Sequence, residues 1–147
     1  MNQLMYALAF AALAVPAMAG SHDFRAIIGD AANIQRDAEK LSRDLKQKDL
    51  DEALVKQDIE ALNTDVSKLK QDVLDMDGKL GQLSEPQKKE WELVKTKAEL
   101  LTIFAARKST LMESGEFRKN RSMLRAHADG IAKRAAMLQQ TVNRLDK

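Results

Sequence analysis

Three consecutive residues near the amino end, Gly20, Ser21 and His22, have the types and the spacing to bind a transition metal. If Gly20 is the first residue of the mature chain, its free amine, two deprotonated backbone amides and the His22 imidazole supply four nitrogens in one plane. Cu(II) and Ni(II) favour such a planar set of nitrogen ligands. The predicted metal site therefore depends on proteolytic removal of residues 1–19.

The first 19 residues have the features of a cleavable secretory signal peptide. An apolar run over residues 4–15 is followed by Pro16 and by a triplet, residues 17–19, whose small outer side chains fit a signal-peptidase cleft, although no Lys or Arg precedes the run. The run is shorter than the ~20 apolar residues that cross a bilayer. We expect cleavage after Ala19, a periplasmic or secreted protein that does not span a membrane once mature, and residues 20–147 as one domain. The new amino end resembles the amino-terminal copper- and nickel-binding motif of some secreted proteins.

The other side chains offer little catalytic or cofactor chemistry. The chain has no cysteine, which excludes disulfides, thiolate metal sites and covalent haem attachment. His127 is the only other histidine. A haem site in a four-helix bundle would also need a methionine on the first helix, and the first helix expected here has none. A calcium loop around Gly78 fails because Val73 and Ser84 would occupy its first and last ligand positions. No Glu-x-x-His pair of a carboxylate-bridged metal site occurs, so we expect no enzyme and no resident cofactor.

A basic cluster surrounds the third expected connection of the chain. It consists of Arg107, Lys108, Arg118, Lys119, Arg121 and Arg125, relieved by Glu113 and Glu116. Outside the cytoplasm such a cluster suits an anionic envelope surface or an acidic protein, whereas nucleic acid is not an expected partner in that compartment. The cluster is also typical of a solvated helix surface, and the net charge of only +2 gives nonspecific polyanion binding no further support.

Helices must position all of these groups, because apolar residues recur at alternating steps of three and four along the mature chain. The first two apolar stripes are Phe24, Ile27, Ala31, Ile34, Ala38, Leu41, Leu45 and then Val55, Ile59, Leu62, Val66, Leu69, Val73, Met76, Leu80, Leu83. The third is Trp91, Val94, Ala98, Leu101, Ala105, Met112, widened by Leu100, Phe104 and Leu111, and the fourth is Phe117, Leu124, Ala128, Ile131, Ala135, Leu138, Val142, Leu145. No segment alternates with the period of a strand, so the sequence predicts an all-α fold.

The helix boundaries leave two architectures open. Gly78 and Gly81 are expected to end the second helix, a Ser84 and Gln87 capping box to start the third, and Gly115 to end it. The first and second stripes continue in register, so these helices could form one rod of an extended two-helix coiled-coil hairpin.

An antiparallel four-helix bundle is favoured over the hairpin, because the weak interruption near Asp49 lies 34 residues before Leu83 and the firm one at Phe117 lies 34 after it. Asp49 and Glu52 would then form the N-cap and N3 pair of the second helix.

Composition also indicates which helices pack together. Small residues on the first and fourth stripes, such as Ala38 and Ala128, predict close packing of the terminal helices. Residues 20–85 carry a net charge of −5 and residues 86–147 one of +7, which favours pairing of the two halves.

The combined expectation is an exported, non-enzymatic interaction or scaffold protein that binds a protein partner, or a second copy of itself, through helix faces. The second helix has β-branched residues and leucines at the heptad positions that two-stranded pairing prefers, and it could serve such a partner if the bundle opened. The competing hypothesis is a Cu(II)- or Ni(II)-binding protein that uses Gly20 to His22.

Overall fold

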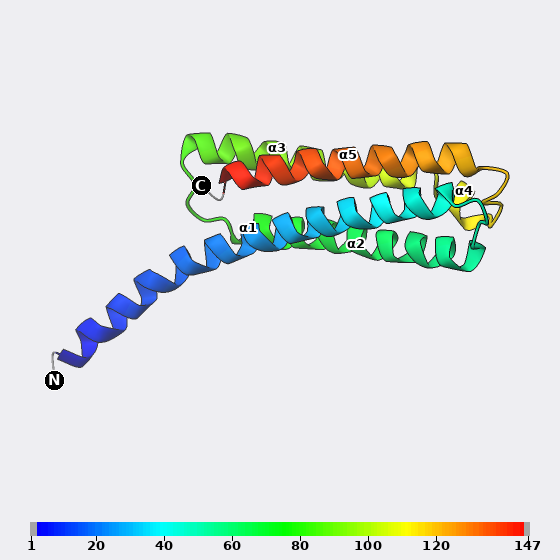
Figure 1. The fold of residues 1–147 in the computed structure, drawn as a ribbon. Helices are drawn as coiled ribbons and strands as arrows, with labels where there is room; N and C mark the ends of the chain where they lie inside the picture. The colour runs from blue at the N-terminus through cyan, green and yellow to red at the C-terminus, as the bar shows by residue number, and fades with distance from the viewer. Residues whose placement is uncertain (1–2, 146–147) are drawn as a thin grey trace.

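The chain folds into helices joined by short connections, in a computed structural model that describes the backbone of residues 3–145 and the side chains of residues 24–145 (Figure 1). The helices are α1 (Gln3–Lys46), α2 (Glu52–Lys79), α3 (Glu85–Ala106), α4 (Ser109–Glu113) and α5 (Arg121–Leu145). The described residues include no strand, so the predicted all-α class is confirmed.

The four long helices form the predicted antiparallel bundle. Helix α1 packs against α2 and α5, and α3 packs against the same two neighbours, so α1 and α3 occupy opposite corners (Figure 1). The hairpin alternative is wrong, because α1 ends at Lys46 and the chain turns back through residues 47–51 before α2 begins.

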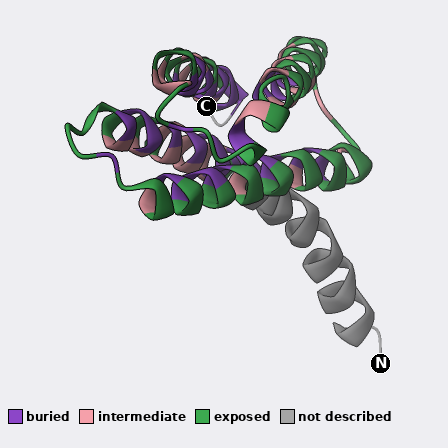
Figure 2. Cartoon of the chain, turned by 90° about the vertical axis from the view of Figure 1, so that its right-hand side faces the viewer, coloured by how far each residue is buried: buried purple, intermediate pink, exposed green. Residues whose placement is uncertain are grey.

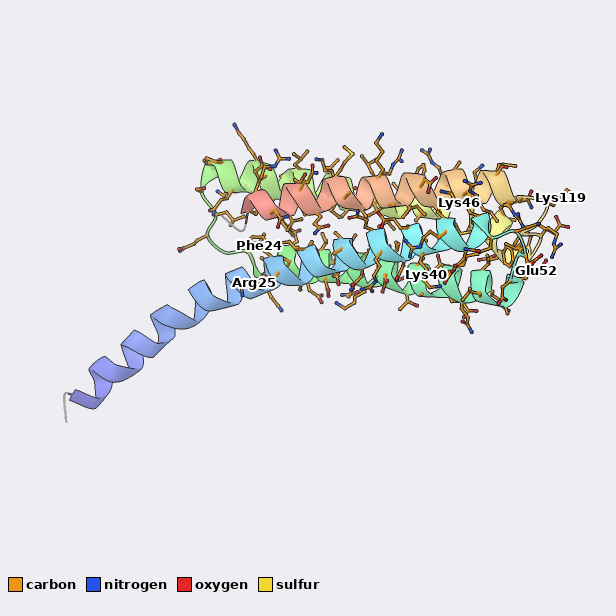
Figure 3. All side chains as sticks on the ribbon, in the orientation of Figure 1. Phe24, Arg25, Lys40, Lys46, Glu52 and Lys119 are labelled. Atoms are coloured by element: carbon orange, nitrogen blue, oxygen red, sulfur yellow. The ribbon has the colours of Figure 1, made fainter. Side chains whose placement is uncertain are left out.

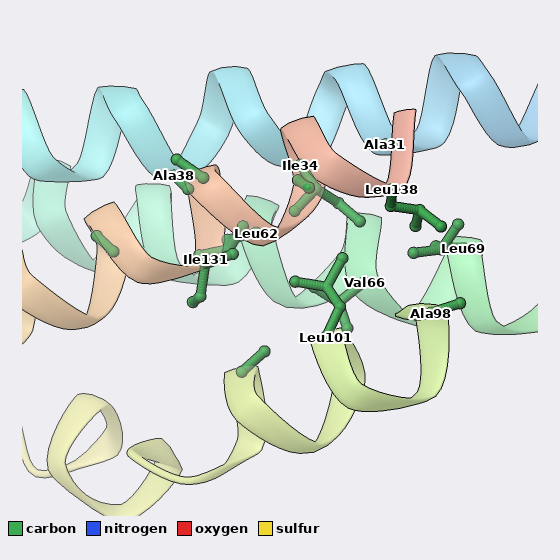
Figure 4. Packing of buried hydrophobic residues seen from close by; sticks show 14 of the residues in the cluster. Ala31, Ile34, Ala38, Leu62, Val66, Leu69, Ala98, Leu101, Ile131 and Leu138 are labelled. Carbon is green, nitrogen blue, oxygen red and sulfur yellow. The ribbon is translucent and has the colours of Figure 1, made fainter. Parts of the chain in front are cut away.

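Nearly all of the expected stripe residues are buried, and each helix turns its buried side inward and its exposed side to solvent (Figure 2). Leucine and isoleucine side chains from all four long helices meet in the middle of the bundle, among them Ile34, Leu62, Leu101 and Ile131 (Figure 4). At one end of the core the rings of Phe24 and Trp91 lie 6.0 Å apart. Removal of this apolar surface from water is the main source of stability in such a fold.

Alanine sets the closest helix pair. Ala31 and Ala38 on α1 and Ala128 and Ala135 on α5 are fully buried. The interface between α1 and α5 is the most extensive of the bundle, because small side chains allow the two axes to approach. The predicted packing of the terminal helices is therefore confirmed.

The capping box at the start of α3 is formed as expected, whereas the cap of α2 is not. The Ser84 hydroxyl accepts from the Gln87 amide, the Gln87 side chain accepts from the Ser84 amide, and Pro86 lies in the first turn. Helix α2 is capped by Asp51, whose carboxylate accepts from the Leu54 amide at 3.1 Å, and not by Asp49. The shift arises because Leu50 is buried and folds the preceding connection onto the core.

Two other helix ends differ from expectation. Gly78 lies inside α2, whose C-cap is Leu80 with an ordinary negative φ of −75°, so no left-handed glycine ends this helix. Helix α3 ends at Ala106, and Gly115, with φ of +73°, follows the short helix α4 instead.

The early end of α3 has a packing reason. Met112 and Phe117, in the connection between α3 and α5, are buried and belong to the core, so this connection packs against it.

Candidate functional site

One face of the bundle, centred on α3, exposes large apolar side chains. Their exposed fractions are 59% for Leu74 on α2, 56% for Leu100 and 48% for Ile103 on α3, and 47% for Met137 on α5. We call these four residues the apolar band and the surface that carries them the α3 face. Within residues 24–145, α1 has no large hydrophobic side chain exposed in this way.

The start of α3 explains why Leu100 faces outward. The capping box fixes the first turn, and Trp91, Val94, Ala98 and Leu101 then turn into the core at steps of three and four. Leu100 lies one residue before Leu101, about 100° around the helix, and therefore stands outside the core. The expectation that Leu100 widens the buried side of this helix is wrong.

A groove between α2 and α3 holds one half of the apolar band. Leu74 and Ile103 line it, together with Lys70, Lys95 and Glu99. Lys95 is held by two acids, Asp77 at 3.2 Å and Glu92 at 2.8 Å. This α2–α3 groove is therefore apolar at its floor and mixed in charge at its rim.

A second groove, between α3 and α5, holds the other half and has a different rim. We call it the α3–α5 groove, and its lining residues are Lys97, Leu100, Leu101, Lys133, Arg134 and Met137. Within residues 24–145 no carboxylate lies within ion-pair distance of its three cations, Lys97, Lys133 and Arg134. Its rim is therefore purely basic.

Two of the three groove cations, Lys97 and Arg134, are held in place by uncharged groups. Lys97 donates to the Thr141 hydroxyl at 2.7 Å. The Arg134 guanidinium lies 3.7 Å from the centre of the Phe104 ring and donates to the Gly130 carbonyl. Such contacts orient a positive charge without neutralising it.

His127 lies beneath this region and is not positioned as a ligand. It is buried, donates to the Ala105 carbonyl at 3.3 Å and packs 4.9 Å from the Phe104 ring. Burial lowers the pKa of His127, and the nearby Lys108 and Arg134 lower it further, against the effect of the hydrogen bond to Ala105. The histidine is therefore neutral and structural.

On the opposite face of the bundle, two lysines between α1 and α2 are each paired with aspartates. Lys40 on α1 contacts Asp44 on its own helix and Asp58 on α2, each at 2.7 Å. Lys68 on α2 contacts Asp72 on its own helix and, at 3.1 Å, Asp30 on α1. The two arrangements are equivalent: in each, the lysine contacts the aspartate four residues later on its own helix and one aspartate on the other helix.

These contacts belong to a sequence repeat that the apolar stripes do not reveal. The pattern Asp-x6-Asp-x2-Lys-Leu-x2-Asp occurs from Asp30 to Asp44 and again, 28 residues later, from Asp58 to Asp72. Four heptads separate the copies, so each copy faces the other once the chain turns back. We call the six repeated aspartates the aspartate seam: Asp30, Asp37, Asp44, Asp58, Asp65 and Asp72.

The seam shifts proton affinities strongly. Burial, with the neighbouring Asp72 carboxylate, raises the pKa of Asp30 to about 7. Burial, with Asp44 and Asp37 respectively, raises the pKa of Asp58 and of Asp65 to about 6 each. One carboxylate oxygen of Asp30 and one of Asp58 are buried with no hydrogen-bond partner in the described part of the chain. The seam is therefore expected to hold α1 against α2 best when Asp30, Asp58 and Asp65 are protonated.

The basic cluster predicted from the sequence gathers at one end of the bundle, on the end of α3, the start of α5 and the segment between them. Lys119 lies at the same end as Lys46 and Glu52, far from Phe24 (Figure 3). Arg107, Lys108, Arg118 and Lys119 are exposed, while Arg121 and Arg125 are partly buried. Binding of an anionic partner at this end stays a prediction.

The predicted metal site, Gly20, Ser21 and His22, lies outside the residues whose side chains the structure describes. Across the part that is described, no group of three or more acidic or histidine side chains is arranged to hold a metal ion. Nor is any described helix long and apolar enough to cross a membrane.

Comparison with known proteins finds no matching family model, no matching curated protein and no matching solved structure. The function must therefore be inferred from the surface of the bundle itself.

Proposed function

We propose that the chain is exported and acts as a non-enzymatic helical-bundle interaction protein, which binds a protein partner through the α3 face. The observation that carries the proposal is the apolar band, with Leu74, Leu100, Ile103 and Met137 each about half exposed or more. Apolar side chains gathered on one face, with charged residues at the edge, are typical of protein-binding surfaces.

The structure also bears on which helix offers the binding face. The heptad positions of α2 that suit coiled-coil pairing, among them Ile59, Leu62 and Val66, are buried in the bundle core. A partner could reach them only after the bundle opened, which would expose the apolar core to water. The α3 face needs no such opening, and this supports α3 as the binding helix.

Site-specific photocrosslinking in living cells tests this proposal. A photoreactive residue replaces Leu100 or Ile103 on the α3 face, and in the control it replaces Glu60, an exposed residue of α2 outside the apolar band. We expect one crosslinked partner from the two α3 positions and none from Glu60. The captured protein is then purified, and Leu100→Ser must weaken its binding to the full chain by about tenfold or more.

Equal crosslinking from Glu60 and Leu100, or full binding by the Leu100→Ser protein, would count against the α3 face. A second copy of the chain as the crosslinked product would redirect the proposal to self-association, which sedimentation at micromolar concentration would reveal.

The sequence supports a second candidate, Cu(II) or Ni(II) binding by Gly20, Ser21 and His22 at a mature amino end. Copper titration of the secreted protein and of its His22→Ala variant tests it, with the amino-terminal residue checked by mass spectrometry. We expect one equivalent of copper to bind with a visible d–d absorption band that the variant lacks. Equal uptake by both proteins would end this candidate.

A further inference from the structure

We infer that the occupant of the α3–α5 groove is an amphipathic helix with acidic side chains, supplied by another protein. The inference rests on the proposed function and specifies the partner that the α3 face fits. It follows from the shape of the groove, from its charge and from the spacing of its cations.

The shape of the groove fits a helix. The floor is apolar, with Leu100 and Leu101 from α3 and Met137 from α5. A depression between two packed helices, whose axes are usually ~8–10 Å apart, runs along both of them and accepts a third helix by ridge-into-groove packing. A flat bilayer would touch the crests of α3 and α5 and leave the floor uncovered, so the shape favours a helix over a membrane surface.

The charge of the groove selects an acidic occupant. Lys97, Lys133 and Arg134 have no carboxylate partner within residues 24–145, whereas Lys40 and Lys68 on the opposite face each contact two aspartates. A second copy of the same face would bring these cations against their own equivalents. Complementary charge across an interface favours encounter and excludes wrong partners, so Glu or Asp is expected beside the apolar stripe of the partner.

The spacing of the cations sets the pattern of the partner. Lys97 is fixed opposite Thr141 by its 2.7 Å hydrogen bond, and Arg134 is fixed over Phe104, seven residues further along α3. Seven residues of helix correspond to about 10 Å. The partner therefore needs two acidic residues about seven positions apart, with apolar residues between them that contact Leu100 and Met137.

Synthetic peptides test this inference on the full chain. The probe is a three-heptad helical peptide with leucine at positions a and d and glutamate at e and g, and its matched control has lysine in place of every glutamate. Binding is measured by fluorescence anisotropy at low salt. We expect the glutamate peptide to bind at least about tenfold more tightly than the lysine peptide, because like charges in contact are strongly unfavourable.

Two pairs of variants locate the bound peptide. Leu100→Ser removes part of the α3–α5 floor, and Leu74→Ser makes the same change, at similar exposure, in the α2–α3 groove. Lys133→Glu reverses a rim charge, and Lys56→Glu makes the same charge change at an exposed site on α2. We expect Leu100→Ser and Lys133→Glu each to weaken glutamate-peptide binding about tenfold, and the two controls to stay within about twofold of the parent.

Four outcomes would overturn the inference: equal affinity for the two peptides, an equal effect of Leu74→Ser and Leu100→Ser, an equal effect of the two charge reversals, or binding only to phosphatidylglycerol vesicles. Circular dichroism melts of each variant show whether it keeps the bundle. If Leu100 still crosslinks a partner in cells while the glutamate peptide does not bind, this inference fails and the proposed function stands. If Leu100 crosslinks nothing, the proposed function itself fails.

Discussion

Two glycines within helices, Gly29 and Gly130, differ in how closely other atoms surround them. A Cβ added at Gly29 in α1 meets no atom within 4 Å, whereas one added at Gly130 in α5 would lie 2.8 Å from the Phe104 ring. Alanine is favoured over glycine in a helix interior by about 1 kcal/mol. We expect Gly29→Ala to stabilise the protein by about that amount in urea unfolding.

Gly130→Ala should instead destabilise the protein, because the Phe104 ring must move away from Arg134 and His127. The two substitutions have the same chemistry, so propensity alone predicts the same sign. A gain at Gly130 equal to the gain at Gly29 would show that the Phe104 ring is not held in place.

The aspartate seam predicts an unusual dependence of stability on pH. Asp30, Asp58 and Asp65 have pKa values raised from 3.8 to about 7, 6 and 6, so the folded state binds protons that the unfolded state has released. Their contribution is fully present below pH 3.8 and is lost as the pH rises through 6 to 7.

Other groups oppose this trend, mainly at lower pH. Asp44, Asp72 and Asp77 have lowered pKa values, and their contribution is lost on acidification below their usual range. His127, whose lowered pKa keeps it neutral, removes stability as the pH falls from about 6.5. Three raised aspartates outweigh one histidine, so we expect a higher urea midpoint at pH 5 than at pH 8.

Asp30→Asn identifies the seam as the cause. The amide stays neutral at every pH, so the fall in urea midpoint from pH 5 to pH 8 should become shallower in this variant. A midpoint that rises from pH 5 to pH 8 in the parent protein, or an unchanged slope in Asp30→Asn, would contradict the assignment.

At the level of residues, the sequence predicted the core far better than the polar contacts. The apolar period identifies buried residues such as Ile34 and Leu138 directly, because each lies on a stripe. Asp30 and Asp58 each lie one residue before a stripe residue, Ala31 and Ile59 respectively. They are therefore at the edge of the apolar stripe, where an exposed side chain is expected. Only the 28-residue repeat of aspartates and lysines could have indicated that Asp30 faces Asp72 and that Asp58 faces Asp44.

At the scale of elements, the contact between α1 and α5 depends on alanine. Ala38→Leu adds three carbon atoms at a fully buried position of α1, and such overpacking typically costs about 1–3 kcal/mol. We expect a loss of that size in urea unfolding, and near-neutral behaviour for Ala61→Leu, which places the same residue on the exposed side of α2. Equal effects of both substitutions would mean that the α1–α5 interface can accommodate a larger side chain.

Helix ends were predicted only where a local side-chain signal marks them. The Ser84 and Gln87 box is such a signal, and it forms as expected. The end of α3 at Ala106 has no such local signal. It accompanies the burial of Met112 and Phe117, which lie further along the chain and pack into the core.

The pattern of apolar residues in the sequence also did not reveal the α3 face. Leu100 and Phe104 widen the apolar stripe of α3 beyond the ~100° that a surface helix usually buries. A wide stripe is compatible both with a deeper core and with an exposed binding surface. Only the positions of α2 and α5 show that Leu100 is left outside.

At the scale of the whole molecule, the two halves differ in how they use charge. The acidic half, α1 and α2, places its aspartates and lysines in contact with one another along the seam. Among the described residues, Lys95–Asp77 is the only ion pair that joins this half to α3 or α5, so the expected attraction between the halves is realised at one point. The cations of the α3–α5 groove have no carboxylate within ion-pair distance in residues 24–145.

Cysteine labelling in intact cells tests the binding role of the α3 face most directly. The chain has no cysteine, so Leu100→Cys and, as control, Glu60→Cys each introduce a single reactive thiol. The proposed export would bring these thiols within reach of a membrane-impermeant maleimide, whose labelling is timed in intact cells and on the purified protein. We expect labelling of Leu100→Cys to be several-fold slower in cells than in isolation, with no such difference for Glu60→Cys. Equal ratios at the two positions would show that nothing covers the α3 face where the protein works.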